Sequence, residues 1–404
     1  MSRVVVVIMA VLVLAACASP PRPADPYVEA IQASGEIPEA QLLDVGIEVF
    51  DPGLPEEGAR PKDGIFEGVR EAEARYLPVQ LKETLQNTGQ WGMVRVVPDG
   101  SVGMDLNVSG RIERSDGELL VLAVAVRDST NRPWFGREYS TRVDSGLYAE
   151  SASLGREPYQ RIFNLIANDL LAFREKLAAA NLTEIRRVSE LRFAQDLSPE
   201  AFEGYLEPRR DGRLEVIRLP AHDDPMLERV RLIRERDFMF LDTLNEHYST
   251  FHRQMESPYQ SWRKFTYEEE IVRREIEQEA FWMKAAGVAA IAGAIMMDGR
   301  SQSAGTARTV LVIGGVEMVK AGVQTGREAT IHESALLELG QSFSAEIQPI
   351  VIEVQGDTRR LEGSAETQYQ EWRELLRAIY GAETGFIEGV PEIQVAAGGA
   401  ESVP

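Results

Sequence analysis

The strongest constraint on the fold is the segment 119–128, in which every second residue from Leu120 to Val126 is a large aliphatic one. Because successive side chains of a strand point to opposite faces, this segment has one apolar face as an extended chain. The residues on that face are Leu120, Leu122, Val124 and Val126. Ser115-Asp116-Gly117 precedes the segment as a turn and joins it to a strand over 104–113. The pattern predicts an antiparallel hairpin with one face buried.

Further elements place this hairpin in a domain over 40–146. Alternating valine and isoleucine predict a strand over 44–50, and helical spacing predicts a helix over 64–87 that Pro78 kinks or divides. Strands over 91–97 and 134–143 complete the order β-α-β-β-β-β. We therefore expect a small antiparallel α/β domain with its helix on one face.

Several motifs of this domain carry a family resemblance. They are Arg75-Tyr76-Leu77-Pro78, Asp105 to Ile112, Ser115-Asp116-Gly117 and Val126-Arg127-Asp128. With them the domain resembles the amino-terminal domain of TolB and the related ABC-transport auxiliary lipoproteins. The resemblance covers about a quarter of the chain and implies a docking-type domain that binds envelope partners, with no active site of its own.

The second part, 150–385, is predicted to be mainly helical. Apolar residues at helical spacing predict a helix over 158–181, and Ser198-Pro199 and Asp224-Pro225 are typical helix starts. From Pro225 a long helix runs to Met255. Pro258 is expected to end it, and a second long helix then runs towards Met297 and packs antiparallel to the first.

The end of this part predicts a small β-hairpin and a last helix. Alternation over 348–355, a turn at Gly356-Asp357 and a return to Gly363 indicate the hairpin, followed by a helix over 366–380. Residues 386–404 are rich in Gly, Ala and Pro and predict a disordered tail. The expected fold class is α+β: the antiparallel domain, then long antiparallel helices with this hairpin.

Small residues recur at four-residue spacing in a segment over 283–326, on both sides of a Gly- and Ser-rich stretch. Such faces let two helices approach closely. Three interpretations stay open for this predicted helical hairpin: a buried core element, which we favour, a self-association surface, or membrane insertion. A membrane span is disfavoured because the first run is short and Glu317 and Lys320 interrupt the second.

The amino terminus indicates export. Arg3 precedes an unbroken apolar run from Val4 to Leu14, followed by small residues. As a helix this run rises about 16 Å, well short of the roughly 30 Å of a bilayer core. Residues 1–16 are therefore expected to be a signal peptide.

Leu14-Ala15-Ala16-Cys17 looks like the lipobox of bacterial lipoproteins. The resemblance implies cleavage before Cys17 and attachment of palmitate-type acyl chains there, each methylene adding about 0.8 kcal/mol of membrane affinity. The alternative is a secretory signal that happens to contain a cysteine. Ala18 after the cysteine resembles the outer-membrane default of lipoprotein sorting, and residues 17–39, which are Pro-rich at their start, form the expected tether.

The sequence does not present a catalytic or metal-binding motif. The histidines are His222, His247, His252 and His332, and none forms an HExxH pair. His222-Asp223-Asp224 is more typical of a helix cap than of a metal site. Mixed-sign clusters over 229–237 and 268–279 are interpreted as solvated helix faces. We expect no catalytic residue, no metal and no cofactor, with Cys17 the only site residue.

The formal net charge of −21 argues against a nucleic-acid partner, because phosphates would be repelled. The leading hypothesis is a non-enzymatic lipoprotein, anchored to the periplasmic face of the outer membrane, that serves as a scaffold, assembly or accessory subunit of an envelope transport or secretion system. Its partner would be an envelope protein or a second copy. The alternatives are a periplasmic cell-wall hydrolase that uses carboxylates and a ring-forming export or pore lipoprotein.

Overall fold

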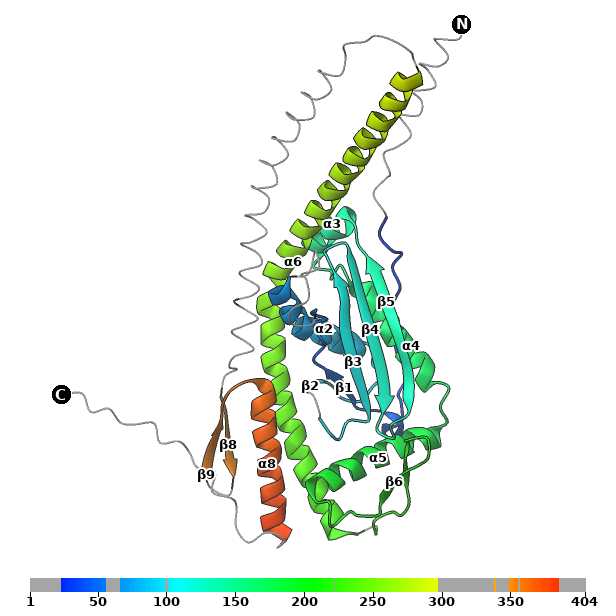
Figure 1. Cartoon of the computed structure of the whole chain (residues 1–404). Helices are drawn as coiled ribbons and strands as arrows, with labels where there is room; N and C mark the ends of the chain where they lie inside the picture. The colour runs from blue at the N-terminus through cyan, green and yellow to red at the C-terminus, as the bar shows by residue number, and fades with distance from the viewer. Residues whose placement is uncertain are drawn as a thin grey trace, which may run out of the picture.

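The computed structural model describes residues 23–55, 66–98, 101–221, 223–296, 338, 349–354 and 357–384. For residues 152, 275–296, 353, 354, 357 and 358 it describes the backbone alone. Helices and strands mix within these ranges, which confirms the α+β class. Figure 1 shows a sheet flanked by helices and one helix, α6, much longer than the others.

The sheet has five strands in the order β2-β1-β3-β4-β5. Their bounds are β1 Val45–Glu48, β2 Val94–Val97, β3 Leu106–Ser115, β4 Leu119–Asp128 and β5 Pro133–Arg142. Helix α2, Glu67–Thr88, follows β1, so the order β-α-β-β-β-β is confirmed. It continues through Pro78 as one helix.

The sheet is mixed and not wholly antiparallel as predicted. β1 pairs in parallel with both β2 and β3, while β3, β4 and β5 pair antiparallel. The reason is the connection through α2, because a helical crossover returns the chain to the end from which the first strand started.

One face of the sheet is buried, as the aliphatic residues at every second position from Leu120 to Val126 predict. In β4 the side chains of Leu120 and Leu122 are fully buried, whereas Ala125 and Arg127 are exposed. Helix α2 and helix α4, Gln160–Arg174, cover the buried face, and their aliphatic residues join it in one core.

Three elements of the next region were not predicted. They are α3 Ser145–Leu154, α5 Ala179–Leu197 and the hairpin of β6 Leu206–Pro208 with β7 Leu214–Val216. A short 3-10 helix, η1, spans Glu39–Gln41. The helix predicted over 158–181 is divided, since α4 ends at Arg174. The helix start predicted at Ser198 was wrong: Ser198 ends α5, because a residue before proline disfavours helical backbone.

Helix α6, Pro225–Met296, is continuous through Pro258. The predicted break at this proline, and with it the antiparallel pair on either side, was wrong. A proline inside a helix costs about 3 kcal/mol. Burial of neighbouring aromatic side chains offsets this cost, because Tyr259 is fully buried and Trp262 is 2% exposed in the same core as the sheet.

The antiparallel helix partner of α6 is instead α8, Ala365–Thr384. Arg229 of α6 pairs with Glu383 near the end of α8, and Phe240 stacks on Trp372 with ring centroids 5.1 Å apart. The predicted β-hairpin is confirmed as β8 Ile350–Val354 and β9 Asp357–Leu361. It lies against α8 and the first half of α6 (Figure 1).

The two predicted parts share their cores. Met255, Tyr259 and Trp262 of α6 belong to the core of the sheet, and Val96 and Met104 belong to the core that α5, α6 and α8 form. The signal segment, Cys17, most of the segment over 283–326 and the tail over 386–404 lie outside the described residues. Of the helices in the described ranges, none combines the length and apolarity that crossing a bilayer requires.

Candidate functional site

Residues 24–33, here called the strap, bind along the body of the protein. Asn164 and Asn168, one turn apart on α4, donate their side-chain amides to the carbonyls of Val28 and Glu29, both at 2.8 Å. Asn168 also accepts from the backbone N–H of Ile31 at 2.9 Å. These side-chain bonds satisfy backbone groups of Val28, Glu29 and Ile31 in an extended chain.

The strap begins at one end of the sheet, beside β5 and the start of α3. The Asp25 N–H donates to the carbonyl of Arg142 at 3.0 Å, and the Arg142 N–H donates to the Asp25 carboxylate at 2.8 Å. The Ala24 N–H donates to Asp144 at 3.2 Å. Asp144 also caps α3. The first described residues are thus fixed at a defined corner of the body.

The β3–β4 turn contacts α6 at the same end of the sheet. Asp116 accepts from the N–H groups of Glu118 and Leu119 at 3.0 and 2.8 Å. Gly117 has a φ of +79°, and a Cβ there would lie 2.4 Å from the carbonyl oxygen of Arg263. Only glycine fits, because it tolerates this φ and leaves room for the α6 backbone.

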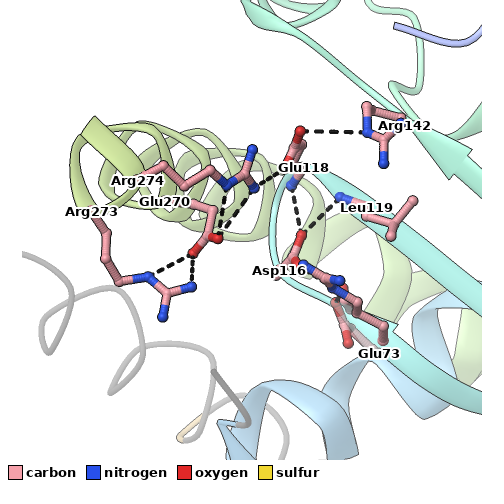
Figure 2. A network of polar contacts seen from close by, with 10 residues as sticks. Glu73, Asp116, Glu118, Leu119, Arg142, Glu270, Arg273 and Arg274 are labelled. Atoms are coloured by element: carbon pink, nitrogen blue, oxygen red, sulfur yellow. Dashed lines mark hydrogen bonds and ion pairs between the residues drawn. The ribbon is translucent and has the colours of Figure 1, made fainter. Parts of the chain in front are cut away.

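A group of charged side chains, here called the clamp, joins the sheet to α6 (Figure 2). The clamp consists of Glu118, Arg142, Glu270 and Arg274. Glu118 accepts from Arg274 and pairs with the Arg142 guanidinium at 3.4 Å. Arg274 also donates to Glu270, at 3.1 and 3.2 Å. One carboxylate on the sheet therefore binds a cation from α6 and a cation from the strand beside the strap.

Burial strengthens the clamp. The Glu118 side chain is 3% exposed, while those of Arg142 and Arg274 are about one quarter exposed. The hydrogen bond to Glu118 raises the pKa of Arg274, with further support from Glu270. Because Glu118 is buried, solvent screens its two ion pairs less than it screens pairs on the surface. The clamp thus fixes the direction in which α6 leaves the sheet.

Beneath the clamp lies a buried polar cluster. Arg263 is fully buried and donates to both oxygens of Glu157. Burial opposes its charge, but the charge of Glu157 outweighs burial and raises the pKa of Arg263 well above its ordinary value. Glu73, also fully buried, accepts from Ser115 and from Tyr259 at 2.6 Å. Burial raises the pKa of Glu73. These groups bind one another and cross-link α2, β3 and α6.

A cavity of about 570 Å³ lies between the strap, α2 and α6. Its lining includes Glu83, Glu157, His252 and Glu256. Glu157 is already occupied by Arg263, and His252 is 6% exposed and stacks on Tyr76 with ring centroids 4.2 Å apart. Burial lowers the pKa of His252 to about 4, so its imidazole is neutral at neutral pH. Arg156, Arg161 and Arg253 also line it, so the cavity can hold a small polar molecule between walls that carry both signs of charge.

The structure places the other residues that the sequence singled out. Asp224 caps α6 by accepting from Met226 at 2.9 Å, which confirms the cap interpretation. His222 and His332 lie outside the described residues. His247 and His252 both belong to α6. In the described part of the chain, no three His, Cys, Asp or Glu side chains are grouped as a metal ion would need.

The prediction that the two charge clusters of α6 are solvated helix faces was wrong in part, because each cluster contains a residue that binds within the protein. Asp237 is fully buried against α8, and Arg274 turns to the sheet. Sequence reasoning missed Glu118, Arg142 and Arg274 as a unit because their partners are up to 156 residues apart. The one available signal was the Asp116-Gly117 turn, which marks the end of the sheet where they meet.

The chain was compared with protein-family models, with curated proteins and with solved structures, and none matches it. The resemblance to the amino-terminal domain of TolB stays a prediction from the sequence.

Proposed function

We propose that the chain is a lipoprotein anchored through Cys17 to the periplasmic face of the outer membrane. There it acts as a non-enzymatic scaffold or accessory subunit of an envelope transport or secretion system. The observation that carries the scaffold role is α6, a single helix of 72 residues that crosses the whole body and continues past the sheet (Figure 1).

The length of α6 supports a mechanical role. At 1.5 Å per residue it measures about 108 Å, several times the roughly 17–20 Å of a typical strand. Its first half packs against α5 and α8 and its middle against the sheet. The clamp then holds it at Arg274. A helix held at several points along its length can hold both ends of the body in a fixed relative position.

The strap supports the anchored location. A chain that leaves a lipidated residue and then binds the body over residues 24–33 keeps that body close to the membrane. Glu73 accepts a hydrogen bond from Tyr259, and Glu157 accepts one from Arg263. Because both carboxylates already bind partners within the protein, they support a structural role for this cluster and a protein without catalysis.

Affinity capture from detergent-solubilised envelopes tests the proposal. The full chain carrying a carboxyl-terminal tag should retain a membrane protein complex through stringent washing. The matched control is Arg274→Gln, which loosens the clamp and leaves the lipidation signal intact. We expect the control to reach the membrane fraction but to retain less of the complex.

Two results would contradict the scaffold role. Recovery of the free monomer alone would argue against a stable envelope complex. Release of soluble fragments from purified peptidoglycan, abolished by Glu256→Gln or Glu83→Gln in the cavity, would instead establish the hydrolase alternative.

A further inference from the structure

The strap starts, and the last part of α6 leaves the body, at the same end of the sheet. Polar contacts connect them in one series: Asp25 binds Arg142, Arg142 pairs with Glu118, and Glu118 binds Arg274. Figure 1 shows α6 running past α3 and beyond this end of the sheet. The chain that leads back to Cys17 therefore starts beside the base of the projecting helix.

The projecting part of α6, residues 275–296, is here called the arm. From Arg274 to Met296 it rises about 33 Å. The number of charged residues differs between the two halves of the arm. The stem, 275–284, contains three glutamates and one lysine, whereas the tip, 285–296, does not contain a charged residue. In a chain in which 26% of residues are charged, the tip is an uncharged, apolar end on a stem that carries four charged residues.

The part of the expected tether that precedes the strap is shorter than the arm. Between Cys17 and Ala24 the chain spans at most about 22–25 Å, at 3.1 Å per residue as polyproline II or up to 3.6 Å fully extended. Pro20, Pro21 and Pro23 favour such an extended form. A body whose corner lies within 25 Å of the bilayer, and from which a 33 Å helix projects at that corner, brings the helix tip to the lipid.

We propose that the tip of the arm, 285–296, binds the same lipid surface that holds the Cys17 anchor, as a second membrane contact. The proposal rests on the anchored location proposed above. The occupant is lipid and not a second copy, because the tether fixes a bilayer within reach of this tip. The contact is an insertion of the helix end and not a span, because the tip rises only about 18 Å against a core of roughly 30 Å.

The acidic stem restricts the depth of the contact. Glu275, Glu277 and Glu279 would meet anionic headgroups with the same sign of charge. Lipid contact should therefore begin beyond Lys284 and end at the tip. With anchor and tip both in the bilayer, the body would be held in a fixed orientation instead of rotating freely on its tether.

Site-directed fluorescence with lipid-borne quenchers tests the proposal. Cys17 is the only cysteine of the chain, and lipidation consumes its thiol, so an introduced cysteine is the one reactive thiol. Ala290→Cys labels the tip and Gln278→Cys the stem. Ile217→Cys labels the residue after β7, whose partner strand β6 lies at the opposite end of the body (Figure 1), and Ile217 is 53% exposed. The lipidated protein carries the fluorophore NBD in phosphatidylethanolamine–phosphatidylglycerol vesicles that contain doxyl-labelled lipid.

We expect NBD at residue 290 to be quenched at least about threefold more strongly than at residue 217, with residue 278 near the control. Adding Ile291→Glu to the Ala290→Cys protein should return quenching to the level of residue 217, while the matched Ile217→Glu should not. A charged residue in the hydrocarbon is strongly disfavoured, so loss of contact is the expected response. Equal quenching at 290 and 217 would overturn the proposal, as would disulfide cross-links between copies at 290 without quenching by lipid.

A second format separates failure of the anchor from failure of the arm. The mature chain with Cys17→Ser and an amino-terminal hexahistidine is held on the same vesicles by a nickel-chelating lipid, which recreates the tether. Absence of lipid on native Cys17 would contradict the proposed location, and quenching at residue 290 in this format would still decide whether the tip binds a bilayer within its reach. Lack of quenching in both formats overturns the inference even if Cys17 is acylated.

Discussion

At the scale of single residues, Gly117 leaves room for a close approach between the β3–β4 turn and the backbone of α6. Its φ is +79°, and a Cβ would lie 2.4 Å and 2.8 Å from backbone atoms of Arg263 and Tyr267. Gly117→Ala should lower the free energy of unfolding by at least about 2 kcal/mol, since backbone atoms on both sides must move. Urea unfolding measures the change.

The control for this substitution is Gly136→Ala on β5. A Cβ at residue 136 meets nothing within 4 Å, and its φ lies in the ordinary range. The free energy of unfolding of this variant should stay within about 0.5 kcal/mol of the parent. Equal effects of the two alanines would show that the turn does not contact α6 as described.

His252 makes stability depend on pH in the acidic range. Burial lowers its pKa from 6.5 to about 4, so its contribution is fully present above pH 6.5 and is lost as pH falls towards 4. Between pH 7 and 5 the loss is about 2 kcal/mol. His252→Phe keeps the ring stacked on Tyr76 and should remove this loss, which unfolding at both pH values would reveal.

Asp237 contributes with the opposite sign, so the comparison must be made between proteins at each pH. Burial raises the pKa of Asp237 from 3.8 to about 6, and its contribution is present below pH 3.8 and is lost as pH rises through 6. His252→Phe leaves this contribution unchanged. A pH dependence identical in the parent and in His252→Phe would contradict the buried, neutral state of His252.

At the scale of elements, the clamp should control local opening of α6. Arg274→Gln removes a cation from Glu118, which is 3% exposed, while Arg142 remains. Because the Arg274 side chain is one quarter exposed, the cost in global stability should be about 1 kcal/mol or less. Hydrogen exchange of the backbone over 264–274 should accelerate, while 240–250 stays protected.

The matched control is Arg273→Gln on the next position of the helix. Its side chain is 55% exposed and pairs with Glu270 on the same helix. Its effect on exchange should be small. Faster exchange of the same size in both variants would assign the effect to helix propensity and not to the clamp.

Pro258 tests the continuity of α6. If the helix runs through this position, Pro258→Ala supplies the missing N–H and removes the steric clash, which should stabilise the protein by about 1–2 kcal/mol after the entropy gained by the unfolded chain. A higher midpoint of thermal unfolding is expected. A lower midpoint would indicate that the chain turns at this proline.

The elements that the sequence predicts correctly are those with strong local periodicity. β4 has aliphatic residues at every second position from Leu120 to Val126, α8 follows helical spacing, and both form as expected. The parallel pairing of β1 was missed because alternation does not encode strand direction. The break expected at Pro258 was wrong because burial of Tyr259 and Trp262, supplied by distant residues, outweighs a local preference.

The candidate site was much less predictable than the elements. Glu118 follows a recognisable turn, but nothing near it in the sequence indicates Arg274 as its partner. Glu73 and Arg263 are charged residues on amphipathic helices, which ordinarily face water. Their burial depends on three elements that converge from separate parts of the chain.

At the scale of the whole molecule, the strap, the clamp and the arm form one arrangement. The strap brings the chain from Cys17 to a corner of the body, the clamp fixes α6 at that corner, and the arm projects from it. This arrangement gives the anchored protein a defined orientation towards the membrane, which a scaffold needs in order to present its body to a partner.

The proposed location and orientation depend most on the lipid at Cys17. Mass spectrometry of the amino-terminal peptide, from protein extracted from membranes, tests this lipid most directly. The predicted result is a mature chain that begins at Cys17 and carries the added mass of its acyl chains. A chain that still begins at Met1, or that begins at Cys17 without acyl chains, would contradict it.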